Sequence, residues 1–451
     1  MAPHSAIHSC LVLCLLLVAP QLGSSYKTTS YYTHGGSRHV VLRDGALSVT
    51  HRLSPCSGAD ADQSMPTISD TFNRDALRLR ALSGSWSNKH SDLTIPSTGT
   101  PLVALPGGSE YHVTVGYGTP VQKLTVGFDT ATAGATFLQC KPCAAGAPCG
   151  KAFDPSRSSS LAQIPCSSHD CPFKACSGPT CTIAVTKKGA VLVNATFVTD
   201  TLTVAPSIPV NDIRVACLEM GARTTDSSSG VIDLSRESHS LASRVVLSPE
   251  TVAFSYCLPW DPATQGFLTF GAVRPERAGR GVTYAKLQRN AGRPNLYFVK
   301  LVGLSIGGID LPVPAAAIAA DALVEVHTTF TYLKPDVYAV LRSNFRWWMK
   351  EYVVAPSSGE LDTCYDFTHL NAIEVPIITL RFEGGASLEL GIEQMMYFKD
   401  RRNIFSVACL AFAPAPAYAP AAAVIGSLAQ SETEVVYDVL GGKLGLVPNR
   451  C

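Results

Sequence analysis

Two apolar stretches of the sequence end on a carboxylate that hydroxyl residues follow, an arrangement that could serve catalysis. The first is Val126–Thr132, which reads VGFDTAT and carries Asp129. A carboxylate at the end of a buried strand is costly unless hydroxyl and main-chain N–H groups hydrogen-bond to it. Thr130 and Thr132 supply hydroxyls on either side of the small Ala131. Taken alone the stretch is ambiguous, because Asp-Thr before a turn is also ordinary turn chemistry.

The second stretch, LVEVHTT at 323–329, carries Glu325 and stands in the other half of the chain. Far downstream of each stretch an apolar triplet enters a turn, at 230–233 in the first half and at 423–426 in the second. This repetition at long period indicates an internal duplication and predicts two lobes with a cleft between them. Because ligand sites favour such clefts, Asp129 and Glu325 are the candidate site residues.

From Tyr111 onward, short alternating apolar runs separated by glycine and proline predict a fold that is mostly β. The runs cover residues 111–115, 201–204, 254–258, 267–270, 297–302, 377–382 and 435–439. One amphipathic helix interrupts them, with Pro335 near its start. Its apolar face is interpreted as core and consists of Val337, Val340, Leu341, Phe345 and Trp348.

Length and charge limit the classes of function that fit. The chain has 451 residues, of which 46% are hydrophobic and 16% charged, and its formal net charge is +1. It can bury a large core in two or three structural units. The near-neutral charge gives no electrostatic case for binding nucleic acid or an anionic membrane.

Residues 1–25 read as a secretory signal peptide. His4 and His8 precede an apolar run from Cys10 to Ala19, and small residues follow at 23–25. That run is too short to span a bilayer, and no later stretch of about 18 apolar residues exists. We therefore expect an exported, soluble protein in the extracellular space or apoplast, with the vacuole as an alternative.

Residues 26–100 are polar and read as a pro-segment. A helical patch over 68–82 places apolar residues such as Phe72 and Leu79 between arginines. A basic helix ahead of a β-rich domain suggests that the segment masks an acidic groove, although a disordered stalk also fits. The predicted lobes follow at 101–290, which includes a cysteine-rich insert, and at 291–451.

Cysteine usage agrees with export. Of 15 cysteines, Cys10 and Cys14 leave with the signal peptide and Cys56 lies in the polar segment, so twelve remain. An even number in an exported chain predicts six disulfides. Cys140-x-x-Cys143 could be half of a zinc site, but no second such pair follows, so neither a metal nor a cofactor is predicted. Asn194 begins a glycosylation sequon.

Many short motifs occur in one order over nearly the whole chain. They are Thr114–Pro120, Phe128–Thr130, Gln139–Cys143, Phe153–Ser156, Asp200–Thr203, Phe254–Pro259, Leu361–Phe367 and Val435–Asp438. In these motifs the sequence resembles the plant pepsin-like aspartic peptidases of the nepenthesin type. The resemblance implies an all-β bilobal fold with minor helices, in which Asp129 and Glu325 face each other across the cleft. It also implies the disulfides Cys140–Cys143, Cys149–Cys217, Cys166–Cys181, Cys171–Cys176, Cys257–Cys451 and Cys364–Cys409.

Members of that family cut peptide bonds with two aspartates that share one proton and activate a water. The two carboxylates must lie about 3 Å apart, where like charges cannot both ionise. Each aspartate stands in an Asp-Thr/Ser-Gly turn. The resemblance places the first turn on Asp129, Thr130, Ala131 and Thr132, and the second on Glu325, Val326, His327 and Thr328.

The second turn departs furthest from the pattern. Glu325 moves the carboxylate outward by roughly 1.5 Å, one C–C bond, and a misplacement of about 1 Å can cost on the order of 100-fold in rate. Val326 removes a hydroxyl that braces the two turns. His327 replaces glycine, which is expensive if φ there is positive; alternatively the imidazole is a new acid, base or ligand. In the first turn Ala131 replaces glycine, which is tolerable if φ is negative.

Departures continue around the cleft. The flap tyrosine position is Lys187, whose side chain we expect to point into water or to form a basic rim for an acidic partner. The tryptophan that partners the tyrosine is Phe137. Asp233 replaces a closing glycine, and is interpreted as a solvated turn residue or as a replacement carboxylate near Asp129.

These patterns lead to one hypothesis and two alternatives. The hypothesis is a secreted, monomeric aspartic endopeptidase homologue with impaired catalysis, which binds or inhibits a polypeptide through the cleft or the cysteine-rich insert. A polysaccharide-degrading enzyme is a candidate partner by analogy with cereal xylanase inhibitors of this fold. The alternatives are an acid-active peptidase that uses an Asp129–Glu325 pair, and a glycan-binding wall protein.

Overall fold

The computed structural model describes thirteen parts of the chain, the longest of which covers the C-terminal third. They are residues 28–32, 46–54, 66–83, 109–131, 136–142, 151–171, 178–187, 190–204, 208–220, 228–245, 251–272, 275 and 281–448. The predicted signal peptide lies outside the described residues, as do Thr132, Cys143, Cys149, Cys176 and Cys451.

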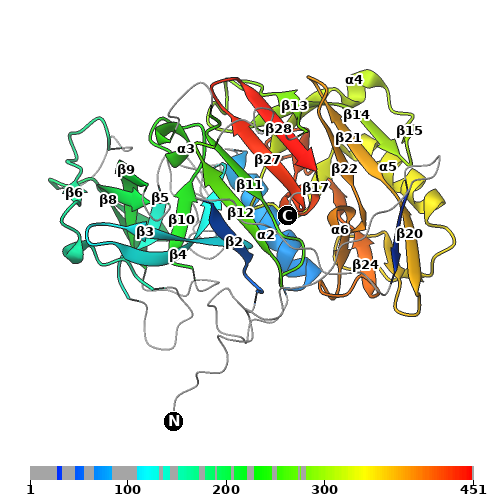
Figure 1. Cartoon of the computed structure of the whole chain (residues 1–451), viewed down its shortest axis with the longest axis horizontal. Coiled ribbons are helices and arrows are strands. Elements are labelled where there is room, and N and C mark those ends of the chain that lie inside the picture. The colour runs from blue at the N-terminus through cyan, green and yellow to red at the C-terminus, as the bar shows by residue number, and fades with distance from the viewer. Residues whose placement is uncertain are drawn as a thin grey trace, which may run out of the picture.

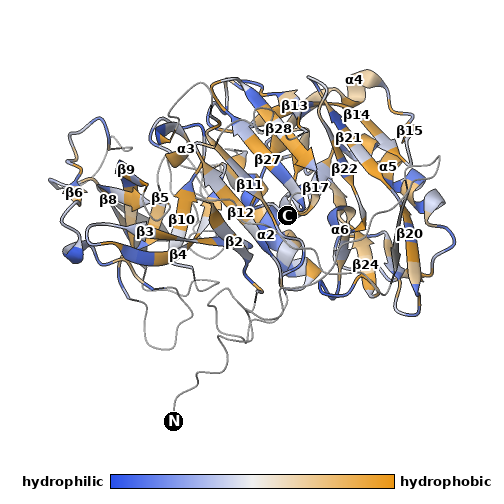
Figure 2. Cartoon of the chain, viewed as in Figure 1, coloured by the Kyte–Doolittle hydropathy of each residue, from blue (hydrophilic) through white to orange (hydrophobic). Residues whose placement is uncertain are grey.

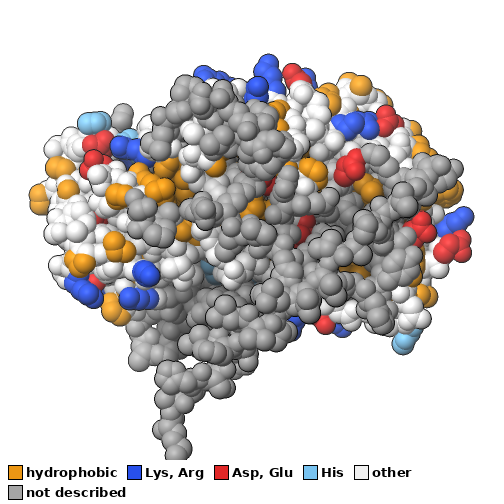
Figure 3. Space-filling model, in the orientation of Figure 1, with side chains coloured by type: hydrophobic (Ala, Val, Ile, Leu, Met, Phe, Trp, Pro, Cys, Tyr) orange, Lys and Arg blue, Asp and Glu red, His pale blue; other side chains and the backbone are white. Residues whose placement is uncertain are grey.

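Strands build two β lobes that lie side by side, and a single long helix, α2, lies between them (Figure 1). The fold is therefore the predicted bilobal one. Figure 2 shows hydrophobic residues concentrated in the strands of both halves, and one continuous buried core runs through them. On the described part of the face in Figure 3, acidic and basic side chains are interspersed, as the near-neutral net charge leads one to expect.

The largest sheet has fourteen strands. In spatial order they are β13 (Thr283–Lys286), β28 (Lys443–Pro448), β27 (Thr433–Asp438), β11 (Phe254–Cys257), β12 (Gln265–Phe270), β2 (Leu47–His51), β3 (Tyr111–Tyr117), β4 (Gln122–Asp129), β10 (Gly230–Asp233), β5 (Thr136–Gln139), β9 (Pro209–Met220), β8 (Ala190–Thr203) and β6 (Ala162–Gln163), with β7 (Thr182–Lys187) paired to β8. The last two strands of the chain thus return to a sheet that the first half builds.

Three smaller sheets complete the second lobe. One contains β22 (Ser387–Leu390), β21 (Ile378–Phe382), β14 (Phe298–Ile306), β16 (Ala320–Val324), β26 (Ala423–Ile425), β17 (Thr331–Leu333), β25 (Phe412–Pro414) and β15 (Ile309–Asp310). A second contains β18 (Val354–Ala355), β19 (Cys364–Asp366), β24 (Val407–Leu410) and β23 (Met396–Phe398). In the third, β1 (Thr28–Tyr32) pairs with β20 (Ala372–Pro376).

Within the described residues helices are few and, apart from two, short. They are α2 (Ile68–Leu82), α3 (Leu241–Arg244), α4 (Ala315–Ile318), α5 (Pro335–Trp348), α6 (Ile392–Met395), α7 (Ser427–Gln430) and the 3-10 turn η3 (Pro155–Arg157). The helix predicted near Pro335 is α5, and its Val337, Leu341 and Phe345 are buried as core. None of the described helices has the length and apolar character that crossing a membrane requires.

The duplication predicted from sequence appears as repeated strand pairing. In the first lobe β4 runs parallel to β10, and Asp129 stands opposite Asp233. In the second lobe β16 runs parallel to β26, and Val324 stands opposite Ile425. Each pairing ends at one of the candidate carboxylates, so the fold brings both to corresponding places.

The predicted pro-segment is part of this architecture. Strand β2 lies inside the large sheet, hydrogen-bonded to β12 on one side and to β3 on the other. Helix α2 buries Phe72, Asp75, Arg78 and Leu79. The N-terminal segment therefore contributes a central strand and a buried helix to the folded chain.

Candidate active site

The first carboxylate accepts a hydrogen bond from the main chain of its own turn. Asp129 is the last residue of β4 and is 1% exposed. The N–H of Ala131 donates to its Oδ1 at 2.8 Å. Ala131 keeps a negative φ, so the methyl group that replaces glycine causes no backbone strain there.

The second carboxylate is held in the same way. Glu325 follows β16 directly and is fully buried. The N–H of His327 donates to its Oε1 at 3.1 Å, and the N–H of Thr328 donates to its Oε2. In both turns the amide two residues after the acid therefore binds the carboxylate. The longer glutamate still lies within reach of its own turn.

His327 connects the two turns. Its Nε2 lies 3.2 Å from the carbonyl oxygen of Phe128, the residue before Asp129. Because a carbonyl only accepts, the imidazole donates from Nε2. Burial, opposed by Asp129 and reinforced by Arg78, lowers the pKa of His327 and so favours the neutral ring. A histidine thus spans the turns where Val326 offers no hydroxyl.

The backbone at His327 also answers a question that the sequence leaves open. Its φ is not positive, so the position does not require glycine and the imidazole is accommodated without strain. The cost that a positive φ would have imposed is absent. The substitution therefore changes the chemistry of the turn without imposing backbone strain.

A guanidinium from α2 lies between the two carboxylates. Arg78 Nη2 is 2.6 Å from Asp129 Oδ1 and 2.8 Å from Glu325 Oε1. All three side chains are buried. Burial opposes the charge of Arg78, but Asp129 and Glu325 outweigh it and raise the pKa of the guanidinium. Burial likewise raises the pKa of Glu325, whereas Arg78 and His327 bring it down to about 2.

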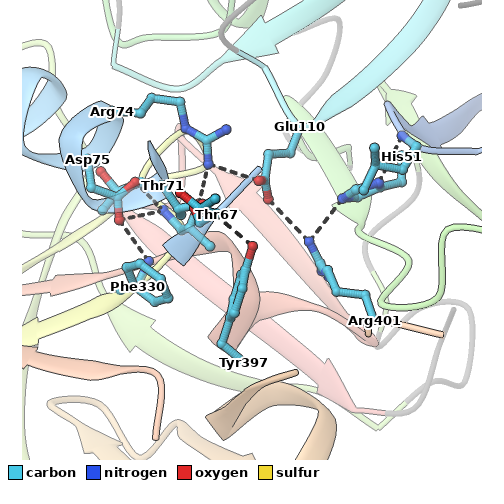
Figure 4. Close-up of polar contacts among 12 residues, drawn as sticks. His51, Thr67, Thr71, Arg74, Asp75, Glu110, Phe330, Tyr397 and Arg401 are labelled. Atoms are coloured by element: carbon cyan, nitrogen blue, oxygen red, sulfur yellow. Dashed lines mark hydrogen bonds and ion pairs between the residues drawn. The ribbon is translucent and has the colours of Figure 1, made fainter. Parts of the chain in front are cut away.

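A second acid of α2 binds main-chain donors of the second lobe. Asp75 accepts from the N–H of Thr329 at 3.0 and 3.1 Å, from the N–H of Phe330 at 3.0 Å and from the hydroxyl of Tyr332 at 3.3 Å. Figure 4 shows Asp75 directed at Phe330. Burial raises the pKa of Asp75 to about 7, although Arg74 and the two amides oppose the rise.

A chain of polar contacts, mostly buried, extends from α2 to β2. Arg74 donates to Glu110 Oε1 at 2.8 Å, and Glu110 Oε2 lies 3.5 Å from Arg401 Nη1. The same nitrogen of Arg401 lies 3.0 Å from His51 Nε2 (Figure 4). Burial, together with Arg401, lowers the pKa of His51. Strand β2 and helix α2 are thus both connected to the second lobe, β2 through Arg401 and α2 through Phe330.

The sequence did not reveal which side chains of α2 contact the carboxylates and the second lobe. It predicted a basic helix over 68–82 that covers an acidic groove, and α2 has these bounds and does cover the carboxylates. The arginine spacing was visible, but nothing in it separated the buried Arg78 from the exposed Arg80. Asp75 carried no sequence signal beyond its place in the helix.

Of the remaining site predictions, one is wrong and the others stay predictions. Asp233 is 1% exposed and its Oδ1 accepts from the N–H of Ser235, so the interpretation as a solvated turn residue is wrong. Its place opposite Asp129 at the end of a buried strand excludes water. Lys187 ends β7 in the hairpin with β8, and its side chain lies outside the described residues. Phe137 is buried in β5, and Asn194 is half-buried in β8.

The disulfide pairing that the resemblance implied is wrong at Cys140 and Cys171. The structure joins Cys140 to Cys217 and Cys171 to Cys181, which excludes the pairs Cys140–Cys143, Cys149–Cys217, Cys166–Cys181 and Cys171–Cys176. The parallel pairing of β5 with β9 brings Cys140 beside Cys217, with Cα atoms 5.3 Å apart. Cys364–Cys409 forms as implied, between directly opposed residues of β19 and β24. The pair Cys257–Cys451 involves a residue outside the described ones.

Metal binding finds no support at the described cysteines. Cys140 is committed to a disulfide and is not available as a zinc thiolate. Within the described ranges, no cluster of three or more His, Cys, Asp or Glu side chains could hold a metal ion.

Comparison with known proteins gives matches over both lobes. Residues 111–272 match the family described as xylanase inhibitor N-terminal, and residues 296–448 match xylanase inhibitor C-terminal. An aspartyl protease family protein of Arabidopsis thaliana is 30% identical over 90% of this chain and 87% of its own length. Aspartic proteinase nepenthesin-1 of Nepenthes gracilis is 26% identical, over 93% and 94%.

A solved structure supports the fold. Conglutin gamma from lupine seeds superposes with a TM-score of 0.57 at 17% identity, covering 76% of this chain and 94% of that protein. At that identity the likeness concerns the bilobal architecture alone.

Proposed function

This chain belongs to the family of plant pepsin-like aspartic peptidases, and from that premise we propose that it is a homologue with impaired hydrolysis whose cleft binds a polypeptide. The observation that carries the proposal is the guanidinium of Arg78, which contacts Asp129 and Glu325 at once. Peptide hydrolysis by a carboxylate pair requires one shared proton and a water between the acids. With α2 in place, a cation occupies that position.

Impairment would persist after α2 leaves, for reasons that lie in the second turn. Glu325 is longer than aspartate, so its free carboxylate has more conformations to lose before it can hold a water. His327 donates to Phe128 O where a hydroxyl would have braced the turns. The flap position carries Lys187 in place of tyrosine. Each change alters how the carboxylates and the substrate are positioned, and correct positioning supplies much of the rate enhancement of an enzyme.

Two observations support a binding role. The turns that carry Asp129 and Glu325 already accommodate a polypeptide helix, through buried contacts of its ionisable side chains. Both matched domain families are described as xylanase inhibitors, which makes a polysaccharide-degrading enzyme a candidate partner. Export fits this role, and the disulfides among the described cysteines suit an oxidising compartment.

The test compares the intact chain with a chain that is cut at a protease site engineered between residues 84 and 108 and in which α2 carries Asp75→Asn and Arg78→Gln, because cutting alone leaves the Arg78 guanidinium on the two carboxylates. Both are incubated with an unfolded protein between pH 2.5 and 5, with and without pepstatin. We expect no cleavage by either form. The triple variant Glu325→Asp, Val326→Ser, His327→Gly should gain pepstatin-sensitive cleavage in this cut form, because it restores the family's second turn.

One observation favours the alternative, an active Asp129–Glu325 pair. Main-chain amides bind both carboxylates in the same pattern, and both acids reach a single nitrogen. In that case the cut chain with the altered α2 and its own Glu325, Val326 and His327 cleaves the substrate, pepstatin blocks the cleavage and Asp129→Asn abolishes it. Such a result would replace the proposal by this alternative.

A further inference from the structure

Helix α2 carries two buried ionisable side chains, one acidic and one basic, that enter two different sites. Asp75 and Arg78 are three positions apart and so lie on one face of the helix. Arg78 contacts the carboxylates of Asp129 and Glu325, whereas Asp75 contacts donors of the second lobe. Both side chains are almost fully buried, 0% and 2% exposed. Neither charge is part of the hydrolytic chemistry of the family.

The donor site that receives Asp75 is built from the chain itself. It consists of the consecutive N–H groups of Thr329 and Phe330 and the hydroxyl of Tyr332, at 3.0 to 3.3 Å. It begins four residues after Glu325, so the donor site and the Glu325 part of the arginine site lie on one continuous segment of the second lobe. Successive main-chain N–H groups that converge on one point form an anion site.

A partner that covers these donors in place of α2 must supply an acceptor for them. A buried N–H group without an acceptor costs more than the same group in water, and a charged acceptor forms the stronger bond. The two sites therefore differ in the charge that they accept. A ligand must match them in the right order along its helix, because a carboxylate beside Asp129 and Glu325 would be repelled.

Apolar contacts fix how a helix lies across the two sites. The ring of Phe72 stacks on Phe330 with centroids 4.5 Å apart, and Leu79 is fully buried. Phe72, Asp75 and Leu79 recur at the spacing of one helical face, beside Arg78. The residues that anchor α2 thus form a pattern that another protein segment could present.

We propose that the cleft is a two-charge recognition site for a helical protein segment that carries a carboxylate and, three residues later, an arginine. The carboxylate binds the Thr329–Phe330 amides with Tyr332, and the arginine binds between Asp129 and Glu325. Helix α2 is the occupant supplied by the chain itself. This inference rests on the proposed binding role and names the chemistry of the partner.

The experiment measures, at pH 8, above the pKa of about 7 that Asp75 has in this site, how peptides bind to the chain cut between residues 84 and 108, in which α2 carries Asp75→Asn and Arg78→Gln to weaken the binding of α2 itself. The probes are synthetic peptides of residues 66–83. We expect the unmodified peptide to bind about 10- to 100-fold more tightly than peptides with either Asp75→Asn or Arg78→Gln.

The decisive control exchanges the two charges. A peptide with Asp75→Arg and Arg78→Asp has the same composition and net charge, and we expect it to bind most weakly. A peptide with Arg80→Gln, which alters an exposed arginine over the ring of Tyr418, should bind within about threefold of the unmodified one. In the protein, Tyr332→Phe should weaken the unmodified peptide and leave the Asp75→Asn peptide unaffected.

The outcomes separate this inference from the proposed function. Equal binding by the unmodified and charge-exchanged peptides, or no binding by the unmodified peptide, overturns the two-charge site whatever the activity. Cleavage of an unfolded protein by the cut chain overturns the proposed function alone. The order of peptide affinities would then describe a substrate preference.

Discussion

His327 shows how one residue can alter the chemistry of a site and keep its geometry. Its backbone N–H still binds Glu325, as the glycine of the family's turn would. Its imidazole adds a contact to Phe128 O, across the cleft. The sequence identified the substitution but could not reveal this contact, because φ and the direction of the ring depend on packing from both lobes.

We predict that His327→Ala lowers the free energy of unfolding by about 2 to 4 kcal/mol, because it leaves a cavity and removes the donor to a buried carbonyl. Chemical denaturation at pH 7 measures the change. His327→Gln keeps a donor and should lose less. His369→Ala, at an exposed histidine, should have an effect within about 0.5 kcal/mol. Equal stability of His327→Ala and the unmodified chain would refute the bracing role.

Glu325 makes stability depend on pH in a predictable direction. Its pKa in the folded chain is about 2, below the ordinary 4.5, because Arg78 and His327 outweigh burial. A carboxylate with a lowered pKa stabilises the fold above its unfolded pKa, and this contribution is lost as the pH falls toward the folded pKa. The relevant window is therefore pH 4.5 down to 2.

We predict that the stability advantage of the unmodified chain over Glu325→Gln is constant above pH 5 and falls by on the order of 3 kcal/mol by pH 2. Urea unfolding at half-unit steps of pH measures it. Glu389→Gln, at an exposed strand position, provides the control. An advantage that stays constant down to pH 2 would mean that Arg78 does not hold Glu325 in its charged form.

At the scale of elements, the N-terminal segment illustrates what periodicity predicts and what it does not. The apolar and basic pattern over 68–82 predicted α2 with its observed bounds. Strand β2 (LSVTH) is only five residues long and was not distinguished from the polar segment around it. Its formation depends on β3 and β12, which are distant in sequence, so no local signal could identify it.

We predict that cutting the chain between residues 84 and 108 does not release the N-terminal segment. Strand β2 pairs on both edges and α2 buries charged contacts, so the fragments should elute together in size-exclusion chromatography and separate only in denaturant. Val49→Pro, in the middle of β2, should release the fragment because it removes a ladder hydrogen bond. Ala46→Pro, just before the strand, is the matched control and should not. Separation of the unmodified fragments without denaturant would contradict this prediction.

At the scale of the whole molecule, features that depend on motif order were predictable and features that depend on distant contacts were not. The motifs and the duplicated turns gave the bilobal β fold and its two carboxylates. The predicted disulfide partners of Cys140 and Cys171 were wrong because the true partners depend on how β5, β9 and the cysteine-rich insert pack. Arg78 was missed for the same reason, since its contacts are 51 and 247 residues away in sequence.

The long-range contacts of α2 should also determine how the molecule unfolds. Arg78 joins the turn of Asp129 in the first lobe to that of Glu325 in the second, and Asp75 adds main-chain contacts to the second. Strands β27 and β28 return to the large sheet and couple the lobes independently. We therefore expect the intact chain to unfold in one cooperative transition.

We predict that Asp75→Asn combined with Arg78→Gln broadens this transition and raises the ratio of calorimetric to van't Hoff enthalpy above unity, because the lobes then unfold with less mutual support. Differential scanning calorimetry at pH 8, above the pKa of about 7 that burial gives Asp75, measures the ratio. Arg80→Gln removes a charge from the exposed face of the same helix and should leave the ratio unchanged. If the double variant only shifts the midpoint of a single transition, α2 stabilises the fold without coupling its lobes, and β27 and β28 alone must carry the cooperativity.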